Sequence, residues 1–130
     1  MKEKLNSLKR LQKGELEGVL IYKKLEKYAP NEEIAKIFNQ LAVDEGRHAS
    51  ILHSYTNTTV KAGKLKPNLI IPLQKIIGWK LLLKIIAGEE YKGYNNYESY
   101  VEEFPELAQV RMDEKRHGDM ALKCIDLLRK

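Results

Sequence analysis

The sequence contains the pattern Asp-Glu-x-Arg-His twice, at residues 44–48 and at residues 113–117. In each copy a glutamate, Glu45 or Glu114, precedes a histidine by three residues. This spacing places the carboxylate and the imidazole on one face of a helix, where both can bind the same metal ion. Two of the three histidines in the chain share this context, so the repeated pattern constrains the fold more than a single Glu-x-x-His would.

The composition is that of one helical domain. A chain of 130 residues is long enough for one hydrophobic core, and we expect a single domain over residues 1–130. Apolar residues make up 43% and β-branched residues do not alternate with polar ones, so we predict an all-α fold. The net charge of +5 is spread among acidic residues, and we expect no nucleic-acid binding. The single cysteine, Cys124, and an N-terminus without a hydrophobic signal favour a cytoplasmic protein.

Apolar residues at helical spacing predict four helices, over residues 5–28, 32–55, 73–103 and 106–128. The third of these has weak points at Gly78, Gly88, Gly93 and residues 95–96. Pro30 ends the first helix, and Asn31 is suited to cap the second. Phe104 and Pro105 separate the last two helices, and residues 56–68, rich in Thr, Lys, Gly and Pro, predict a long crossover. The predicted architecture is a four-helix bundle made of two helix hairpins joined by this crossover.

Each predicted helix has one glutamate in its inward apolar stripe, and two of the helices add a histidine. The six residues are Glu15, Glu45, His48, Glu90, Glu114 and His117. The two halves of the chain also repeat one another, since Tyr22 follows Glu15 by seven residues and Tyr97 follows Glu90 by seven. Two hairpins related by an approximate twofold axis would bring the four carboxylates and two imidazoles to one centre.

Four ionised carboxylates in an apolar core would repel one another and lose their hydration, unless cations balance them. Two divalent ions would do so, with Glu45 and Glu114 bridging them. Glu15 with His48 would complete one end of the centre, and the equivalent pair of the second half the other. Oxygen and imidazole ligands suit iron or manganese, with zinc also possible, and we expect two iron ions that share O₂ or hydrogen peroxide.

The order Glu…Glu-x-x-His…Glu…Glu-x-x-His resembles the ferritin-like di-iron carboxylate superfamily, and rubrerythrin-type domains in particular. The segments Gly14-Glu15, Lys66-Pro67-Asn68 and Gly88-Glu89-Glu90 are also similar to the ferritin-like domain attached to vacuolar-iron-transporter-type proteins. The resemblance covers essentially the whole chain and implies the metal ligands Glu15, Glu45, His48, Glu90, Glu114 and His117.

Two departures from rubrerythrins stand out. Gly93 occupies the position where they often carry a further acidic ligand. The chain also lacks the paired Cys-x-x-Cys motifs of a rubredoxin domain, so an electron donor would be another protein.

The spacing of the second pair of glutamates conflicts with straight helices. Glu15 and Glu45 are 30 residues apart, but Glu90 and Glu114 only 24, which would place the second pair about 9 Å out of level. A bend near Gly93 and residues 95–96, or a tilted hairpin, would correct this. Otherwise Glu89, or less readily Glu98, would replace Glu90.

The predicted function is a redox enzyme that oxidises Fe(II) with O₂ or reduces hydrogen peroxide. Its candidate catalytic residues are Glu45, Glu114, Tyr22 and Tyr97, although the two tyrosines would serve equally well as core residues. The alternatives are an iron-binding or iron-sensing module that serves another protein, and a structural bundle without metal.

Residues 69–86 form the most apolar stretch of the chain. Several lysines interrupt it, so we expect no membrane span. Its second face is expected to be buried in a homodimer, with contact to a membrane surface as the alternative.

Overall fold

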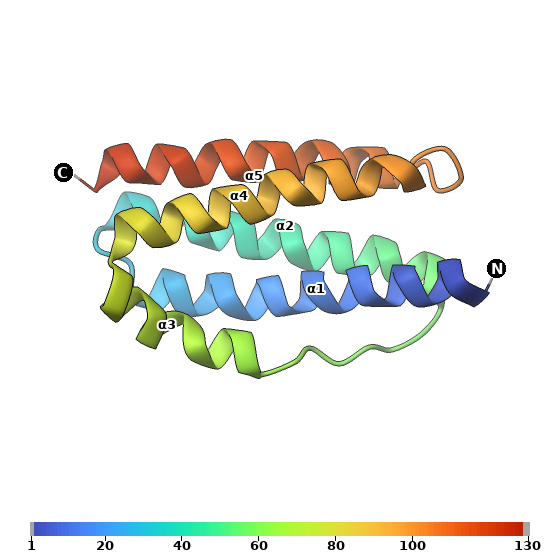
Figure 1. Ribbon diagram of the computed structural model, residues 1–130, viewed down its shortest axis with the longest axis horizontal. Helices are drawn as coiled ribbons and strands as arrows, with labels where there is room; N and C mark the ends of the chain where they lie inside the picture. The colour runs from blue at the N-terminus through green and yellow to red at the C-terminus, as the bar shows by residue number, and fades with distance from the viewer. Residues whose placement is uncertain (1, 129–130) are drawn as a thin grey trace.

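The computed structural model describes residues 2–128, which form five α-helices and one short 3₁₀ helix. These are α1 (Lys2–Lys27), α2 (Glu32–Thr56), α3 (Leu65–Ile77), α4 (Trp79–Tyr97), η1 (Glu98–Tyr100) and α5 (Leu107–Leu127). Helices α1 and α2 form one antiparallel hairpin and α4 and α5 the other, and the two hairpins meet where α2 packs against α5 (Figure 1). The predicted all-α bundle of two hairpins is therefore confirmed.

The tight turn of the first hairpin depends on Asn31. Its side chain accepts a hydrogen bond from the backbone N–H of Ile34 at 2.9 Å, which satisfies one of the free donors at the start of α2, as predicted. The same side chain donates to the carbonyl of Leu127 at 3.0 Å. Asn31 therefore also ties this turn to the end of α5.

The prediction of one continuous helix over residues 73–103 is wrong. Residues 73–97 of this segment form parts of two helices, α3 and α4, which meet at Gly78. This glycine has φ of +83°, a conformation that side chains other than glycine rarely adopt, so the chain changes direction there. The crossover is also shorter than predicted, since α3 already begins at Leu65.

The second hairpin turns earlier than predicted, and this removes the conflict in spacing. Helix α4 continues through Gly93 and ends at Tyr97, after which residues 98–106 form η1 and turns. Glu90 lies seven residues before the end of α4, and Glu114 lies seven residues after the start of α5 at Leu107. The two glutamates are therefore level, and neither Glu89 nor Glu98 is needed in place of Glu90.

The apolar core has two parts with a polar layer between them. One part, around Leu25, Phe38 and Leu83, lies toward the turn between α1 and α2 and contains Cys124. The other, around Leu8 and Leu107, lies toward the opposite end of the bundle. The six predicted ligands form the buried layer between these clusters.

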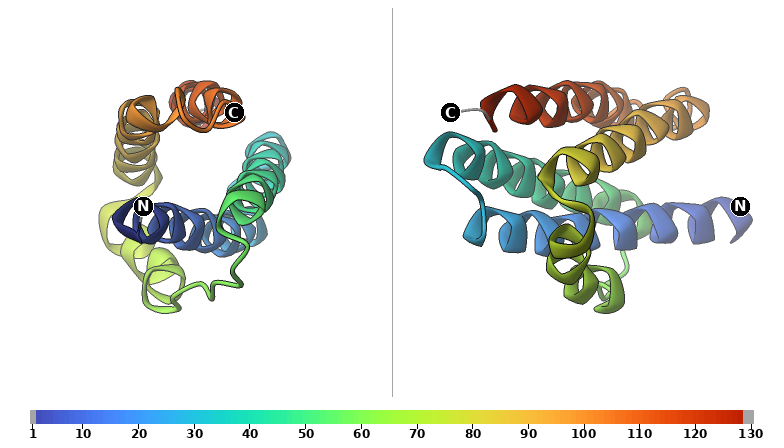
Figure 2. Two further views of the ribbon diagram at one scale, coloured as in Figure 1. Left: turned by 90° about the vertical axis from the view of Figure 1, so that its right-hand side faces the viewer. Right: turned by 60° about the vertical axis from the view of Figure 1, so that its left-hand side comes forward.

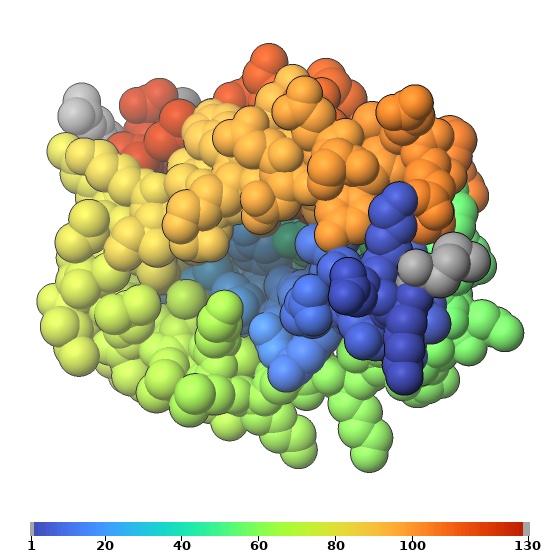
Figure 3. Space-filling view, turned by 45° about the vertical axis from the view of Figure 1, so that its right-hand side comes forward, coloured from blue at the N-terminus to red at the C-terminus, as the bar shows by residue number. Residues whose placement is uncertain are grey.

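One side of the bundle is open. No Cα atom of α1 comes within 8 Å of one in α4, and the end-on view in Figure 2 shows these two helices standing apart. Helix α3 packs against both of them and covers only part of this side. A cleft of about 610 Å³ remains between the three helices and is visible as a hollow in Figure 3. Among residues 2–128, no helix has the length and apolar content needed to cross a membrane.

Candidate metal centre

The structure brings all six predicted ligands to one place at the middle of the bundle. They form two groups, in each of which one potential ligand atom per residue lies within 4.8 Å of the others. The first group contains Glu15, Glu45, His48 and Glu114, and the second contains Glu45, Glu90, Glu114 and His117. Because Glu45 and Glu114 belong to both groups, they occupy the positions that bridging carboxylates would require.

The histidines face the glutamates through their Nδ1 atoms. Nδ1 of His48 lies 2.7 Å from Oε1 of Glu15, 3.3 Å from Oε1 of Glu114 and 3.4 Å from Oε2 of Glu45. Nδ1 of His117 lies 3.2 Å from Oε2 of Glu90. The two imidazole rings stack with their centroids 5.6 Å apart, so the two halves of the centre are in direct contact.

The other ring nitrogens bind aspartates of the opposite hairpin. Nε2 of His48 lies 2.7 Å from Oδ2 of Asp113, and Nε2 of His117 lies 2.9 Å from Oδ2 of Asp44. Because an ionised carboxylate only accepts hydrogen bonds, each Nε2 carries the proton and donates it. Each aspartate therefore orients the histidine so that Nδ1 points toward the glutamates.

Two arginines hold these aspartates in place. Arg47 donates to Asp113 at 2.7 Å, and Arg116 donates to Asp44 at 2.9 Å. Burial opposes ionisation of the aspartates, but hydrogen bonds outweigh it: those from His48 and Arg47 lower the pKa of Asp113, and those from His117 and Gln40 lower the pKa of Asp44. In a purely structural bundle the arginines would pair with the inward glutamates, but here they pair with the aspartates.

The aspartates and arginines were not among the sequence-predicted site residues, because they lie beside the apolar stripes rather than on them. The signal that could have found them is their repetition, since both pentapeptides contain the same aspartate and the same arginine.

Three of the four central glutamates have raised pKa values in the absence of a cation, so they hold a proton more tightly than a free glutamate does. Burial raises the pKa of Glu15 to about 7 and that of Glu114 to about 10, and the charges of neighbouring glutamates add to both shifts. Burial and the charge of Glu15 likewise raise the pKa of Glu45. Burial acts on Glu90 as well, but hydrogen bonds from His117 and Glu114 outweigh it and lower the pKa.

Burial would lower the pKa of both histidines, yet the surrounding carboxylates raise it. Without metal ions, the protons held by the glutamates and histidines therefore balance part of the negative charge of the cluster.

Two buried carboxylate oxygens have no hydrogen-bond partner among the described residues. They are Oε2 of Glu45 and Oε1 of Glu114, one on each potential bridging residue. Nδ1 of His48 lies 3.4 and 3.3 Å from them but forms its hydrogen bond with Glu15. An unsatisfied buried acceptor is costly, and a metal ion would satisfy both. Together with the mixed oxygen and imidazole donors, this shows that the residues present fit a pair of metal ions.

Two glycines leave room for the same two carboxylates. A Cβ atom added at Gly18 would lie 2.8 Å from Oε1 of Glu45, and one added at Gly93 would lie 3.1 Å from Oε2 of Glu114. Gly18 follows Glu15 by three residues, as Gly93 follows Glu90. Position 93 carries no acidic side chain, and the carboxylate of Glu114 occupies the space that such a side chain would need.

The two predicted tyrosines lie beside the centre but differ in their contacts. Tyr22 donates a hydrogen bond to Oε1 of Glu90 at 2.9 Å. The hydroxyl of Tyr97 is buried and has no partner among the described residues. Burial, with the charges of nearby glutamates, raises the pKa of both hydroxyls well above its ordinary value, so both remain protonated.

The alternative ligands lie elsewhere. The side chain of Glu89 is 68% exposed and pairs with Lys92, and that of Glu98, in η1, lies 3.8 Å from Arg111.

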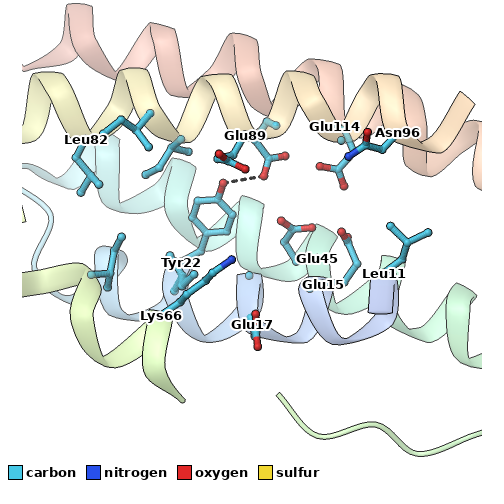
Figure 4. A pocket seen from close by; sticks show the side chains of 18 of the residues that line it. Leu11, Glu15, Glu17, Tyr22, Glu45, Lys66, Leu82, Glu89, Asn96 and Glu114 are labelled. Atoms are coloured by element: carbon cyan, nitrogen blue, oxygen red, sulfur yellow. Dashed lines mark hydrogen bonds between the residues drawn. The ribbon is translucent and has the colours of Figure 1, made fainter. Parts of the chain in front are cut away.

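The cleft on the open side of the bundle leads to the centre. All four central glutamates line its wall, together with both tyrosines, and Figure 4 shows the carboxylates of Glu15, Glu45 and Glu114 near one another. A small molecule can therefore reach the carboxylates from solvent.

One comparison with known proteins finds a match: a family model described as Rubrerythrin covers residues 6–125. No curated protein and no solved structure matches the chain.

Proposed function

The chain belongs to the rubrerythrin family, within the ferritin-like di-iron carboxylate superfamily, and on this premise we propose that it is a di-iron oxidoreductase. Its reaction is the oxidation of Fe(II) by O₂ or the reduction of hydrogen peroxide. The observation that carries the proposal is the pair of ligand groups that share Glu45 and Glu114, each with an unpartnered oxygen.

The proposal gives each member of the cluster a position. Glu45 and Glu114, which belong to both ligand groups, would hold both iron ions, Glu15 and His48 would hold one of them, and Glu90 and His117 would hold the other. Manganese or zinc would use the same donors. The metal ions, when bound, supply the electron-transfer chemistry that no protein side chain of this set can supply.

The surrounding residues prepare the ligands for this role. Asp113 and Asp44 accept the Nε2 protons of the histidines, which leaves each Nδ1 free to bind a metal ion. Tyr22 holds the carboxylate of Glu90 through its hydroxyl. The cleft admits O₂, hydrogen peroxide or Fe(II), and an external donor protein returns electrons if the chain acts as a peroxidase.

The test uses adjacent glutamates as a matched pair. Glu90→Gln should lose one or both iron ions and the oxidation that follows mixing of the reduced protein with O₂ or hydrogen peroxide. Glu89→Gln, which removes an exposed carboxylate of the same helix, should retain both. Iron content and near-ultraviolet absorption after mixing are the measurements.

Glu45→Ala and Glu114→Ala should abolish the reaction, because each removes a ligand shared by both groups. Unchanged peroxide turnover in these two variants would refute the proposal. Two tightly bound iron ions without turnover under any electron donor would instead indicate an iron-binding module.

A further inference from the structure

The cleft extends beyond the glutamates into a region with apolar walls. Leu69 and Leu73 of α3 and Ile85 of α4 line it there, and their exposed fractions are 52%, 38% and 44%. Single exposed leucine or isoleucine side chains are common on protein surfaces. These three, however, come from two helices and border one cavity. No described segment of the chain covers them, so the apolar part of the cleft is suited to an apolar ligand.

The size of the cleft favours a small molecule over a helix of another protein. Its volume of about 610 Å³ lies within the range of about 300–1,000 Å³ typical of small-molecule sites. A helix with its side chains is at least about 10 Å wide, so this volume would hold roughly 8 Å of it, or one and a half turns. An extended hydrocarbon chain is much narrower than a helix, so a longer piece of it fits in the same volume.

The charged groups at the edge of the cleft favour an anionic head group. Lys66 lines the cleft, points into it in Figure 4 and forms no ion pair with a described residue. The acidic residues of this edge already have partners, since Glu17 accepts from the backbone N–H of Gly63 at 2.9 Å and Glu89 pairs with Lys92. Lys66 and Arg10, which also lines the cleft and donates to the hydroxyl of Ser7, are therefore the cations of this lining with which an anionic ligand can still pair.

We propose that this cleft binds an aliphatic carboxylate, with its hydrocarbon chain between Leu69, Leu73 and Ile85 and its carboxylate at Lys66. The site shares the cleft with the four central glutamates but uses other residues of its wall, and it does not depend on the redox function proposed above. Iron content and oxidation kinetics can therefore fail while this binding is retained, and the reverse.

The probe is dodecanoate, titrated calorimetrically into the purified full chain below the concentration at which it forms micelles. One molecule should bind per chain. In methyl NMR spectra, the signals of Leu73 and Ile85 should shift and that of Ile76, which lies outside the cleft, should not. Dodecylamine, with the same chain and the opposite charge, should bind at least about tenfold more weakly, because it would meet Lys66 with a like charge.

Two matched pairs of variants test the contacts with the hydrocarbon chain and the contact with the carboxylate of the ligand separately. Ile85→Asp should weaken dodecanoate binding at least about tenfold, since it places a carboxylate in the apolar wall. Leu81→Asp, on the same helix with a similar exposed fraction of 48% but outside the cleft, should not. Lys66→Gln should remove the preference for dodecanoate over dodecylamine, whereas Lys64→Gln, also outside the cleft, should keep it.

Three results would overturn the proposal. One is no saturable binding of dodecanoate. Another is equal weakening by Ile85→Asp and Leu81→Asp. The third is binding to vesicles of anionic phospholipid without binding to monomeric dodecanoate, which would assign the apolar residues to a membrane surface.

Discussion

At the scale of single residues, the centre depends on the different partners of the two ring nitrogens of each histidine. Nε2 binds an aspartate of the other hairpin and Nδ1 faces the glutamates. The half-exposed arginines fix the buried aspartates, so ion pairs between α2 and α5 determine the orientation of the two candidate histidine ligands. Mutations outside the six ligands should therefore alter metal binding.

Asp113→Asn is the direct test of this arrangement. The amide retains the shape of the carboxylate but accepts the proton of His48 Nε2 less strongly, so metal affinity should fall by about 10- to 100-fold. Competition with a chelator would measure the affinity. Asp119→Asn is the control, because Asp119 lies on the same helix, outside the cluster, and accepts a hydrogen bond from the partly buried Tyr91. Equal affinities of the two variants would contradict the role assigned to Asp113.

The protonated glutamates predict how the stability of the metal-free protein depends on pH. The folded pKa of Glu15, about 7, is above its ordinary value of 4.5, so the folded chain binds the proton more tightly than the unfolded chain. This contribution is complete below about pH 4.5 and is lost as the pH rises through about 7. The raised pKa of His48 acts in the same direction, and the lowered pKa values of the aspartates act at lower pH.

The melting temperature of chelator-treated protein should therefore fall between about pH 5 and pH 8. Glu15→Gln should flatten this dependence. Metal affinity should rise over the same range, because binding displaces the protons. A melting temperature that rises with pH would contradict the assignment.

At the scale of helices, α1 and α4 carry the same residue types at equivalent positions. Each has a glutamate ligand candidate, then a glycine three residues later and a tyrosine seven residues later. The glycines lie in helix interiors, where they are unfavourable relative to alanine by up to about 1 kcal/mol. Their positions beside the carboxylates of Glu45 and Glu114 explain why the helices tolerate this cost.

Gly18→Ala should separate stability from metal binding. The helix gains up to about 1 kcal/mol of intrinsic propensity, but the new methyl group displaces the carboxylate of Glu45. The metal-free melting temperature should stay the same or rise, while metal affinity falls. Gly14→Ala is the matched control on α1, because a Cβ atom there meets nothing within 4 Å. Equal metal affinities of the two variants would show that Gly18 has no such role.

The helices that were predicted well from the sequence have long apolar stripes, and capping or helix-breaking residues mark their ends. Asn31 and Pro30 mark the first hairpin turn, and α2 begins at the predicted residue. Gly78 was predicted only as a weak point of one helix and not as a break, because apolar residues continue on both sides of it and a glycine in a sequence does not show whether its φ is positive. The end of α4 at Tyr97 was missed for a similar reason, since the polar residues after it can also form a helix.

The same distinction applies to the candidate site. The six ligand candidates could be identified because charged residues on an apolar stripe are unusual. The aspartates and arginines lie beside the stripes and are marked only by their repetition in the two pentapeptides. Their partners could not be predicted, because only the packing of α2 against α5 brings Asp44 to His117 and Asp113 to His48.

At the scale of the whole molecule, the two hairpins are joined mainly through α2 and α5, and the opposite side is open. The contacts across the centre also run between hairpins, as in the hydrogen bond from Tyr22 to Glu90. Metal ions bound by both hairpins would add to this connection, so removal of metal should lower the melting temperature.

The surface of α3 and α4 outside the cleft predicts self-association. Ile76 is 81% exposed and Leu81 is 48% exposed, and neither lines the cleft. We predict that the chain forms a homodimer through this surface and that Ile76→Lys weakens it. Sedimentation velocity over a range of concentrations would measure the association. A monomer at all concentrations, or a dimer unaffected by Ile76→Lys, would contradict this assignment.

The most direct test of the central claim is the metal content and metal position of protein purified without oxygen. Elemental analysis should find two iron ions per chain, and anomalous scattering should place them between the four glutamates, within reach of Nδ1 of His48 and of His117. A chain that binds no stoichiometric metal after reconstitution, or binds it away from Glu45 and Glu114, would contradict the account.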